Sequence, residues 1–289
     1  MPVKENMNNQ QIIKKDPMIT VIRPKKALSL LDLKEMWLFR ELVYFLTWRD
    51  LKVRYKQTVL GVMWAVLNPF LTMVVFSIFF GNLAKVPSDG VPYPIFAYTA
   101  LLPWGLFSNA LSVASRSLVN NRHMITKVYF PRVILPLSSV LAGLVDFLIA
   151  SVILVGMMLY YGYTPTANAW MVIPFLILTL VTSIGTGLWL SAANVLYRDV
   201  NYITPFLTQF WMFITPIAYG ASLLPEKWQL IYALNPMAGV VEGFRWALLG
   251  TEQGAPGPRL IVSTGVALFV LVSGMIYFRR MERQFADMV

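Results

Sequence analysis

Six long apolar stretches divide this sequence, and they limit its possible folds more than any other feature. Each holds 19 to 28 residues, and a helix of that length can cross the hydrocarbon core of a bilayer, which is about 30 Å thick. With 57% hydrophobic and only 13% charged residues, the chain has too little polar surface for one soluble domain. We therefore predict an all-α integral membrane protein with six transmembrane helices, at Val62–Phe80, Ile95–Ala114, Val133–Tyr160, Val172–Val195, Ile203–Ala221 and Leu260–Phe278.

A seventh apolar region, Leu224–Leu249, differs from the other six because prolines, glycines and four charged residues interrupt it. Charged side chains near the middle of a bilayer are costly, and irregular backbone is tolerated there only when protein surrounds it. We therefore expect this region to form a re-entrant helical hairpin between the fifth and sixth spans.

Lys and Arg are unequally divided between the two sides of this topology. One side holds 20 of them and the opposite side holds 4. Because short basic loops stay in the cytoplasm, both termini are predicted to be cytoplasmic. The expected organisation is a cytoplasmic segment over residues 1–61, a transmembrane domain over 62–278 and a cytoplasmic tail over 279–289.

Just before the first span, five apolar residues recur at helical spacing, which predicts an N-terminal amphipathic helix at the membrane interface. Charged residues occupy its other faces. The helix is either a membrane anchor or an element that positions a charged lipid headgroup, and these interpretations are compatible. The apolar residues are Trp37, Tyr44, Trp48, Leu51 and Tyr55.

Several kinds of site are excluded by composition. The chain has no Cys and one His, so thiolate or His-rich metal sites and a Cys/His nucleophile arrangement are ruled out. It has no GxxxxGK[ST] loop, so we do not expect it to hydrolyse ATP. Its net charge of +10 lies in loops and near the start of the chain, which argues against nucleic-acid binding. No catalytic residue, metal or cofactor is therefore expected on this chain.

Six blocks of sequence, in this order, resemble the permease subunits of O-antigen and teichoic-acid exporters, members of the ABC-2 type polysaccharide export family. Capsule-export permeases are related to them. The blocks are WRDLKVRYKQTVLGVMWAVLNP (Trp48–Pro69), LLPWGLFSNAL (Leu101–Leu111), ITKVYFPRVILPLSSV (Ile125–Val140), YRDVNYI (Tyr197–Ile203), FITPIAYG (Phe213–Gly220) and LNPMAGVVEGFRWALLG (Leu234–Gly250).

This resemblance implies a homodimer in the bacterial inner membrane, partnered by two copies of a separate ATPase that binds ATP and Mg. The implied substrate is a polysaccharide linked to a polyprenyl pyrophosphate. For the contact with the ATPase we expect a short coupling helix after the second span, although a solvated basic loop would obey the same charge rule. Its candidate residues are Ser117, Asn120, Asn121, Arg122, His123 and Lys127.

Two further groups are candidates for the substrate path. Basic residues at the cytoplasmic entrance would meet the pyrophosphate, and aromatic faces would let sugars slide. Positive-inside topology and ordinary helix packing are the competing explanations. The entrance candidates are Trp48, Arg49, Arg54, Tyr55 and Lys56; the channel-lining candidates are Tyr98, Trp104, Phe107, Asp146, Phe206, Phe210 and Phe213.

Asp146 stands near the middle of the third span, where a carboxylate needs water or a partner. It either lines a channel or hydrogen-bonds a Ser or Asn on another span, since no span offers an obvious cation. In the hairpin, the resemblance implies an exit gate formed by Gly239, Glu242, Gly243 and Arg245. Glu242 and Arg245 are three residues apart and are expected to pair with each other.

The leading functional hypothesis is therefore the transmembrane permease of an ABC exporter for O-antigen or a related cell-wall glycan. An ABC-2 permease for small lipids or drugs would share this topology. A membrane glycosyltransferase is a different class, but it normally needs an acidic metal-binding loop, and the acids here are scattered.

Overall fold

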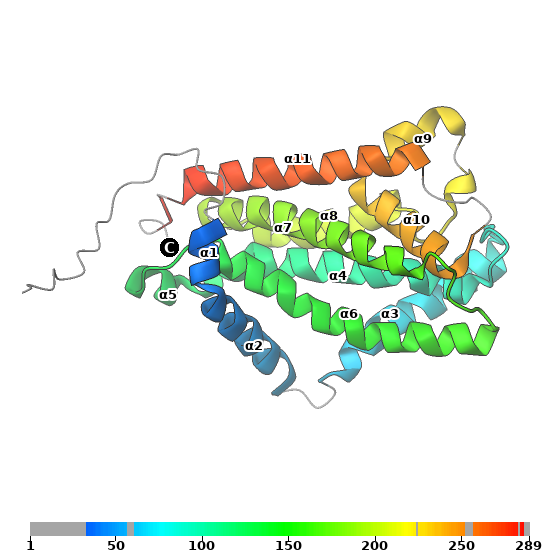
Figure 1. Cartoon of the computed structure of the whole chain (residues 1–289), viewed down its shortest axis with the longest axis horizontal. Helices are drawn as coiled ribbons and strands as arrows, with labels where there is room; N and C mark the ends of the chain where they lie inside the picture. The colour runs from blue at the N-terminus through cyan, green and yellow to red at the C-terminus, as the bar shows by residue number, and fades with distance from the viewer. Residues whose placement is uncertain (1–32, 57–60, 224, 252–256, 283, 286–289) are drawn as a thin grey trace, which may run out of the picture.

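The computed structural model describes residues 33–56, 61–223, 225–251, 257–282 and 284–285. Within these ranges every regular element is a helix, and the long helices run side by side in an elongated bundle (Figure 1). One end carries α5 and the residues near the C-terminus, and the other carries α9 and the α6–α7 turn; these are the α5 end and the α9 end. The elements are α1 Leu33–Leu38, α2 Arg40–Lys56, α3 Met63–Phe76, the π-helix η1 Ser77–Leu83, α4 Tyr93–Asn120, α5 Arg122–Lys127, α6 Ile134–Tyr161, η2 Ala169–Met171, α7 Val172–Leu196, α8 Val200–Ile214, η3 Ala221–Leu223, α9 Glu226–Tyr232, α10 Pro236–Leu249 and α11 Gly257–Met281.

Helix α4 lies at the centre of the bundle and packs against α3, α6, α7, α8 and α10. Most of its side chains are buried, from Tyr93 at its start to Leu118 near its end. Because protein surrounds it, α4 accommodates small and polar residues such as Thr99 and Ser115, which are buried too.

Among the residues that the structure describes, four helical stretches are long and apolar enough to cross a membrane: Met63–Leu83, Ile134–Tyr161, Ala169–Leu196 and Gly257–Met281. They correspond to the first, third, fourth and sixth predicted spans, so the all-α membrane fold is confirmed while the count of six is not. The second predicted span is α4, which has 28 residues.

The fifth predicted span, Ile203–Ala221, is shorter in the structure than the sequence suggests. Helix α8 has 15 residues, which corresponds to about 22 Å. It ends at Ile214 because a proline disfavours the helical conformation of the residue before it. Thr215, which precedes Pro216, is accordingly extended, with φ −89° and ψ 139°.

The interrupted region at residues 224–249 forms two short helices, α9 and α10, as the hairpin prediction requires. Asn235 caps α10 by accepting a hydrogen bond from the backbone N–H of Met237, and Pro236 occupies the first turn. Helix α10 packs against α4, α7 and α11, so these helices cover much of its surface. Residue 224 lies outside the described residues.

The segment predicted as an interfacial helix is helical, as α1 and α2, and α2 packs against α6. Tyr44 and Trp48 of the predicted stripe are exposed, as an interfacial helix requires. Phe45 and Val53 are exposed too, so the apolar surface is wider than one stripe, and Leu46 is the residue of α2 buried against the bundle. Of the predicted cytoplasmic segments, residues 1–32, 57–60, 283 and 286–289 lie outside the described residues.

Helices α7 and α11 approach each other unusually closely. A Cβ placed on Gly185 would lie 2.7 Å from backbone atoms of Leu271, and one on Gly274 would lie 2.4 Å from the carbonyl oxygen of Gly185. Next to this contact the rings of Trp189 and Tyr277 stack, with centroids 4.2 Å apart. Small residues of this kind allow two membrane helices to pack backbone to backbone.

Candidate functional site

A cavity of about 700 Å³ lies between α2, α3, α4, α6 and α8. Its wall combines aromatic rings with polar groups, including Trp64 and Asn68 from α3 and Trp104 from α4. Small-molecule sites commonly have about this volume and this mixture of apolar walls with a few polar groups. The cavity is therefore the principal candidate for contact with a substrate.

Asp146 is the centre of the polar groups in this cavity. Its carboxylate accepts a hydrogen bond from the Asn109 side-chain amide at 2.9 Å. It also accepts hydrogen bonds from the guanidinium of Arg54 and the hydroxyl of Tyr55, both on α2. Three donors from two helices thus converge on one acid of a third helix.

The predicted spans contain no obvious cation that could pair with Asp146. In the structure this cation comes from α2, outside the predicted spans. Arg54 reaches Asp146 because α2 packs along α6. The side chains of Arg54 and Asp146 remain 25% and 16% exposed, so the ion pair is partly accessible. Asn109 supplies the interhelical hydrogen bond that was the second interpretation of Asp146.

Tyr55 acts in this cluster as a neutral donor. Burial, together with its hydrogen bond to Asp146, raises the pKa of the Tyr55 hydroxyl above its ordinary value. The hydroxyl therefore keeps its proton at physiological pH and presents it to an anion.

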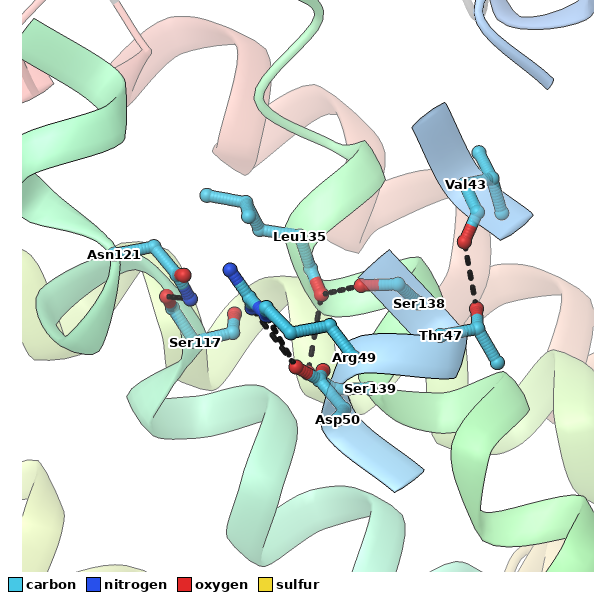
Figure 2. A network of polar contacts seen from close by, with 9 residues as sticks. All are labelled: Val43, Thr47, Arg49, Asp50, Ser117, Asn121, Leu135, Ser138 and Ser139. Atoms are coloured by element: carbon cyan, nitrogen blue, oxygen red, sulfur yellow. Dashed lines mark hydrogen bonds and ion pairs between the residues drawn. The ribbon is translucent and has the colours of Figure 1, made fainter. Parts of the chain in front are cut away.

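The remaining entrance candidates lie elsewhere on α2. Arg49 forms an ion pair with the adjacent Asp50 at 2.8 Å (Figure 2). Trp48 and Lys56 are exposed and do not line the cavity. Of the five candidates, the structure brings only Arg54 and Tyr55 into the cavity.

The channel-lining candidates separate into three groups. Trp104 and Asp146 line the cavity. Tyr98 and Phe107 are fully buried in the described chain: the Tyr98 hydroxyl donates to the carbonyl of Ala150 at 3.0 Å, and Phe107 packs edge-on against Trp211. These two residues hold helices of the bundle together.

The third group forms an exposed aromatic stripe on α8. Phe206 is 72% exposed, and its ring stacks on that of Phe210 with centroids 6.4 Å apart. Phe213 continues the stripe and is also exposed. This surface is available to lipid or to another protein surface.

The short helix α5 presents the predicted basic surface at the α5 end. Arg122, His123 and Lys127 are exposed, whereas Ile125 faces the core. Asn120 is also exposed, but Ser117 is buried and its hydroxyl donates to the carbonyl of Ala114 at 2.7 Å.

Asn121 forms the turn between α4 and α5. Its amide donates to the carbonyl of Ser117 at 2.7 Å (Figure 2). Ser117 and Asn121 therefore shape this connection, while the exposed residues of α5 are the ones that a partner can reach.

Residues near the C-terminus pack against the connection between α5 and α6, which the sequence alone did not indicate. Phe285 is fully buried, in edge contact with Phe278 and beneath the guanidinium of Arg132. Arg132 also donates a hydrogen bond to the carbonyl oxygen of Glu282. The connection between α5 and α6 is thereby fixed to the end of α11.

At the α9 end, the expected pairing of Glu242 with Arg245 is wrong. Glu242 instead lies 3.5 Å from Arg259 of α11. Arg245 is buried and points the other way, donating to the carbonyls of Phe96, Pro216 and Ile217 at 3.2, 2.6 and 2.8 Å. Helical spacing placed the two residues close together, but their side chains leave the helix toward different neighbours.

Gly239 and Gly243 allow the close helix approach that their spacing predicts, each toward a different neighbour. A Cβ on Gly239 would lie 2.6 Å from the Ser263 hydroxyl of α11. One on Gly243 would lie 2.3 Å from the ring of Phe175 in α7. Helix α10 is therefore closely packed in this structure.

Known proteins similar to this chain agree with the resemblance inferred from its motifs. Residues 41–249 match the family described as ABC-2 type transporter. The chain is 29% identical over 262 residues to the O-antigen export system permease protein RfbA of Myxococcus xanthus, covering 89% of this chain and 98% of that protein.

Two further relatives are similar over most of their lengths. An O-antigen export system permease protein RfbA of Klebsiella pneumoniae is 28% identical, with 86% of this chain and 95% of the relative covered. The polysialic acid transport protein KpsM of Escherichia coli is 24% identical, with 81% and 91% covered. The family match extends over most of the helical bundle and includes the cavity residues Arg54, Asn109 and Asp146, and the chain belongs to the ABC-2 type transporter family of membrane proteins.

Proposed function

We propose that this chain is the transmembrane permease subunit of a bacterial inner-membrane ABC exporter for a polyprenyl-pyrophosphate-linked polysaccharide, either O-antigen or a related cell-wall glycan. The observation that carries the proposal is similarity to two O-antigen export permeases over 95% and 98% of their lengths. Identity to the polysialic acid transport protein is lower, at 24%.

The cavity and the α8 stripe support an export path. Arg54 and Tyr55 provide donors for an anionic headgroup, and Trp64 and Trp104 provide apolar wall beside them. The exposed aromatic stripe of α8 would face a second copy across a shared conduit in a homodimer. Aromatic surfaces suit a moving glycan because they contact sugar rings without fixing one register.

Energy for transport would come from two copies of a separate cytoplasmic ATPase, which bind ATP and Mg while this chain binds no cofactor. Helix α5, with exposed Arg122, His123 and Lys127, is the proposed contact. Both termini then lie in the cytoplasm, as the excess of basic residues at that side indicates. Closure of the ATPase would move the bundle as a rigid body.

The experiment deletes the gene in its host bacterium and follows the glycan in cell fractions. Export predicts that lipid-linked polymer is made at its usual level, accumulates inside the cell and reaches the surface again when the gene is restored. Loss of the polymer itself would favour the glycosyltransferase hypothesis. Normal surface glycan after deletion would favour a permease for small lipids or drugs.

A further inference from the structure

We propose that Arg54 is a diphosphate-binding residue and that Asp146 is its internal competitor, which only an anion stronger than a single phosphodiester displaces. The inference rests on the proposed function and names the group that the cavity recognises. It also assigns a role to Asp146 that neither channel lining nor helix packing provides.

The donors around Asp146 form an anion site whose occupant in this structure is a side chain. A guanidinium, a phenol hydroxyl and an amide N–H all point at the same carboxylate, from Arg54, Tyr55 and Asn109. Each group donates equally well to a phosphate oxygen, and the planar guanidinium fits phosphate as well as carboxylate. A ligand that replaces the Asp146 carboxylate therefore finds its donors already oriented.

The site is accessible and has room for a lipid head. Arg54 and Asp146 line the cavity of about 700 Å³ and remain partly exposed. Trp64, Ala65 and Leu101 contribute apolar wall beside them, on which the first part of an isoprenoid chain can lie. A headgroup and the start of its tail therefore fit in one continuous space.

Competition by Asp146 explains how such a site can be selective inside a membrane. Ordinary phospholipids surround the protein in great excess, and most of them carry one negatively charged phosphodiester. The Asp146 carboxylate carries the same single negative charge as a phosphodiester. Because it belongs to the same chain as Arg54, it loses no translational entropy when it binds, whereas a phospholipid does. A diphosphate brings roughly two negative charges and more acceptor oxygens, so it can displace the carboxylate where a phosphodiester does not.

The exchange would also change how α2 is held. In this structure Arg54 and Tyr55 both bind Asp146, so the last turn of α2 is joined to α6 by two polar contacts. A diphosphate that takes these donors releases the last turn of α2 from these two contacts, while the rest of α2 still packs against α6. Substrate binding is thereby coupled to the position of the interfacial helix.

The test measures binding to the full chain in phosphatidylcholine nanodiscs by microscale thermophoresis. The probes are geranylgeranyl diphosphate, phosphatidylglycerol, which carries one phosphodiester, and inorganic pyrophosphate. We expect the lipid diphosphate to bind, and Arg54→Gln to weaken it about tenfold or more. Arg40→Gln is the matched control: Arg40 begins α2, contacts Trp37 and lies outside the cavity, so binding should stay within about twofold of wild type.

Asp146→Asn distinguishes a competitor of the diphosphate for Arg54 from a residue with only a structural role. Removing the competitor should tighten diphosphate binding about threefold or more, whereas a merely structural Asp146 would lose binding as Arg54→Gln does. Asp146→Ser tests the same point if the Asn variant does not fold. Unchanged binding in Arg54→Gln, or weaker binding in the folded Asp146 variants, overturns the inference.

The three probes distinguish the chemistry and its source. Phosphatidylglycerol binding at least about tenfold weaker than the lipid diphosphate supports the site, and equal binding overturns its selectivity. If inorganic pyrophosphate binds as tightly as the lipid diphosphate, the site binds free diphosphate, and the lipid is overturned as its ligand. Export in deletion cells is measured separately from binding. If the wild-type gene restores export but Arg54→Gln binds the diphosphate normally, only this inference is rejected. If deletion causes no export defect, the proposed function is rejected.

Discussion

The guanidinium of Arg245 lies over the ring of Phe96, with 3.4 Å between its carbon and the ring centroid, and its Nε donates to the backbone carbonyl of the same residue. Further donors bind the carbonyls of Pro216 and Ile217, in the turn that follows α8. One buried side chain of α10 therefore fixes the start of α4 and the end of α8.

We expect Arg245→Met to lower the free energy of unfolding by about 3 kcal/mol or more, because it removes the hydrogen bonds that Arg245 donates to three backbone carbonyls in a buried site. The measurement is thermal unfolding of the purified chain in nanodiscs. The control is Arg280→Met, the same change at an exposed position of α11, which should leave the midpoint nearly unchanged. Equal midpoints for both variants would contradict the structural role of Arg245.

Arg54 and Asp146 should be coupled in stability as well as in binding. Arg54→Gln and Asp146→Asn each remove one side of the ion pair, and a double-mutant cycle isolates the interaction. We expect a coupling energy of about 1 kcal/mol, since both side chains are partly exposed and solvent weakens the attraction. Strict additivity of the two changes would show that the contact contributes nothing.

The α7–α11 contact should not tolerate a methyl group. Gly185→Ala places its Cβ against the backbone of Leu271, so the helices must separate, at a cost of about 1–3 kcal/mol. Gly265→Ala, also in α11, is the control because a Cβ there meets nothing within 4 Å. The thermal midpoint should fall for the first variant only; a fall of the same size in both would point to a general effect of replacing glycine.

Phe285→Ala should loosen the α5 end. The ring is fully buried against Phe278 and Arg132, and its removal leaves a cavity that costs about 3 kcal/mol. Hydrogen exchange measured by mass spectrometry should increase in residues 122–132. Phe269→Ala removes a ring that is 71% exposed in α11 and should leave exchange at the α5 end unaltered. If both variants behave alike, Phe285 does not anchor this region.

The sequence by itself determined the membrane class and the places of the long helices, with close limits for two of them. The predicted span Val133–Tyr160 differs from α6 by one residue at each end. The predicted span Val172–Val195 begins where α7 begins and ends one residue earlier. This agreement has a simple cause: a long apolar run is stable as a helix in lipid whatever its neighbours, because the helix satisfies its own backbone hydrogen bonds. Prolines and charges likewise indicated the short helices α9 and α10.

Only the tertiary structure decided which side chains meet. Arg54 and Asp146 are 92 positions apart, and their contact depends on how α2 packs along α6. Tyr98 is buried while Phe206 is exposed, although both stand in apolar helices. Lipid and protein interior are equally apolar, so residue type cannot distinguish a ring that faces one from a ring that faces the other. The packing of the helices makes that distinction, and with it the cavity and the environment of Arg245.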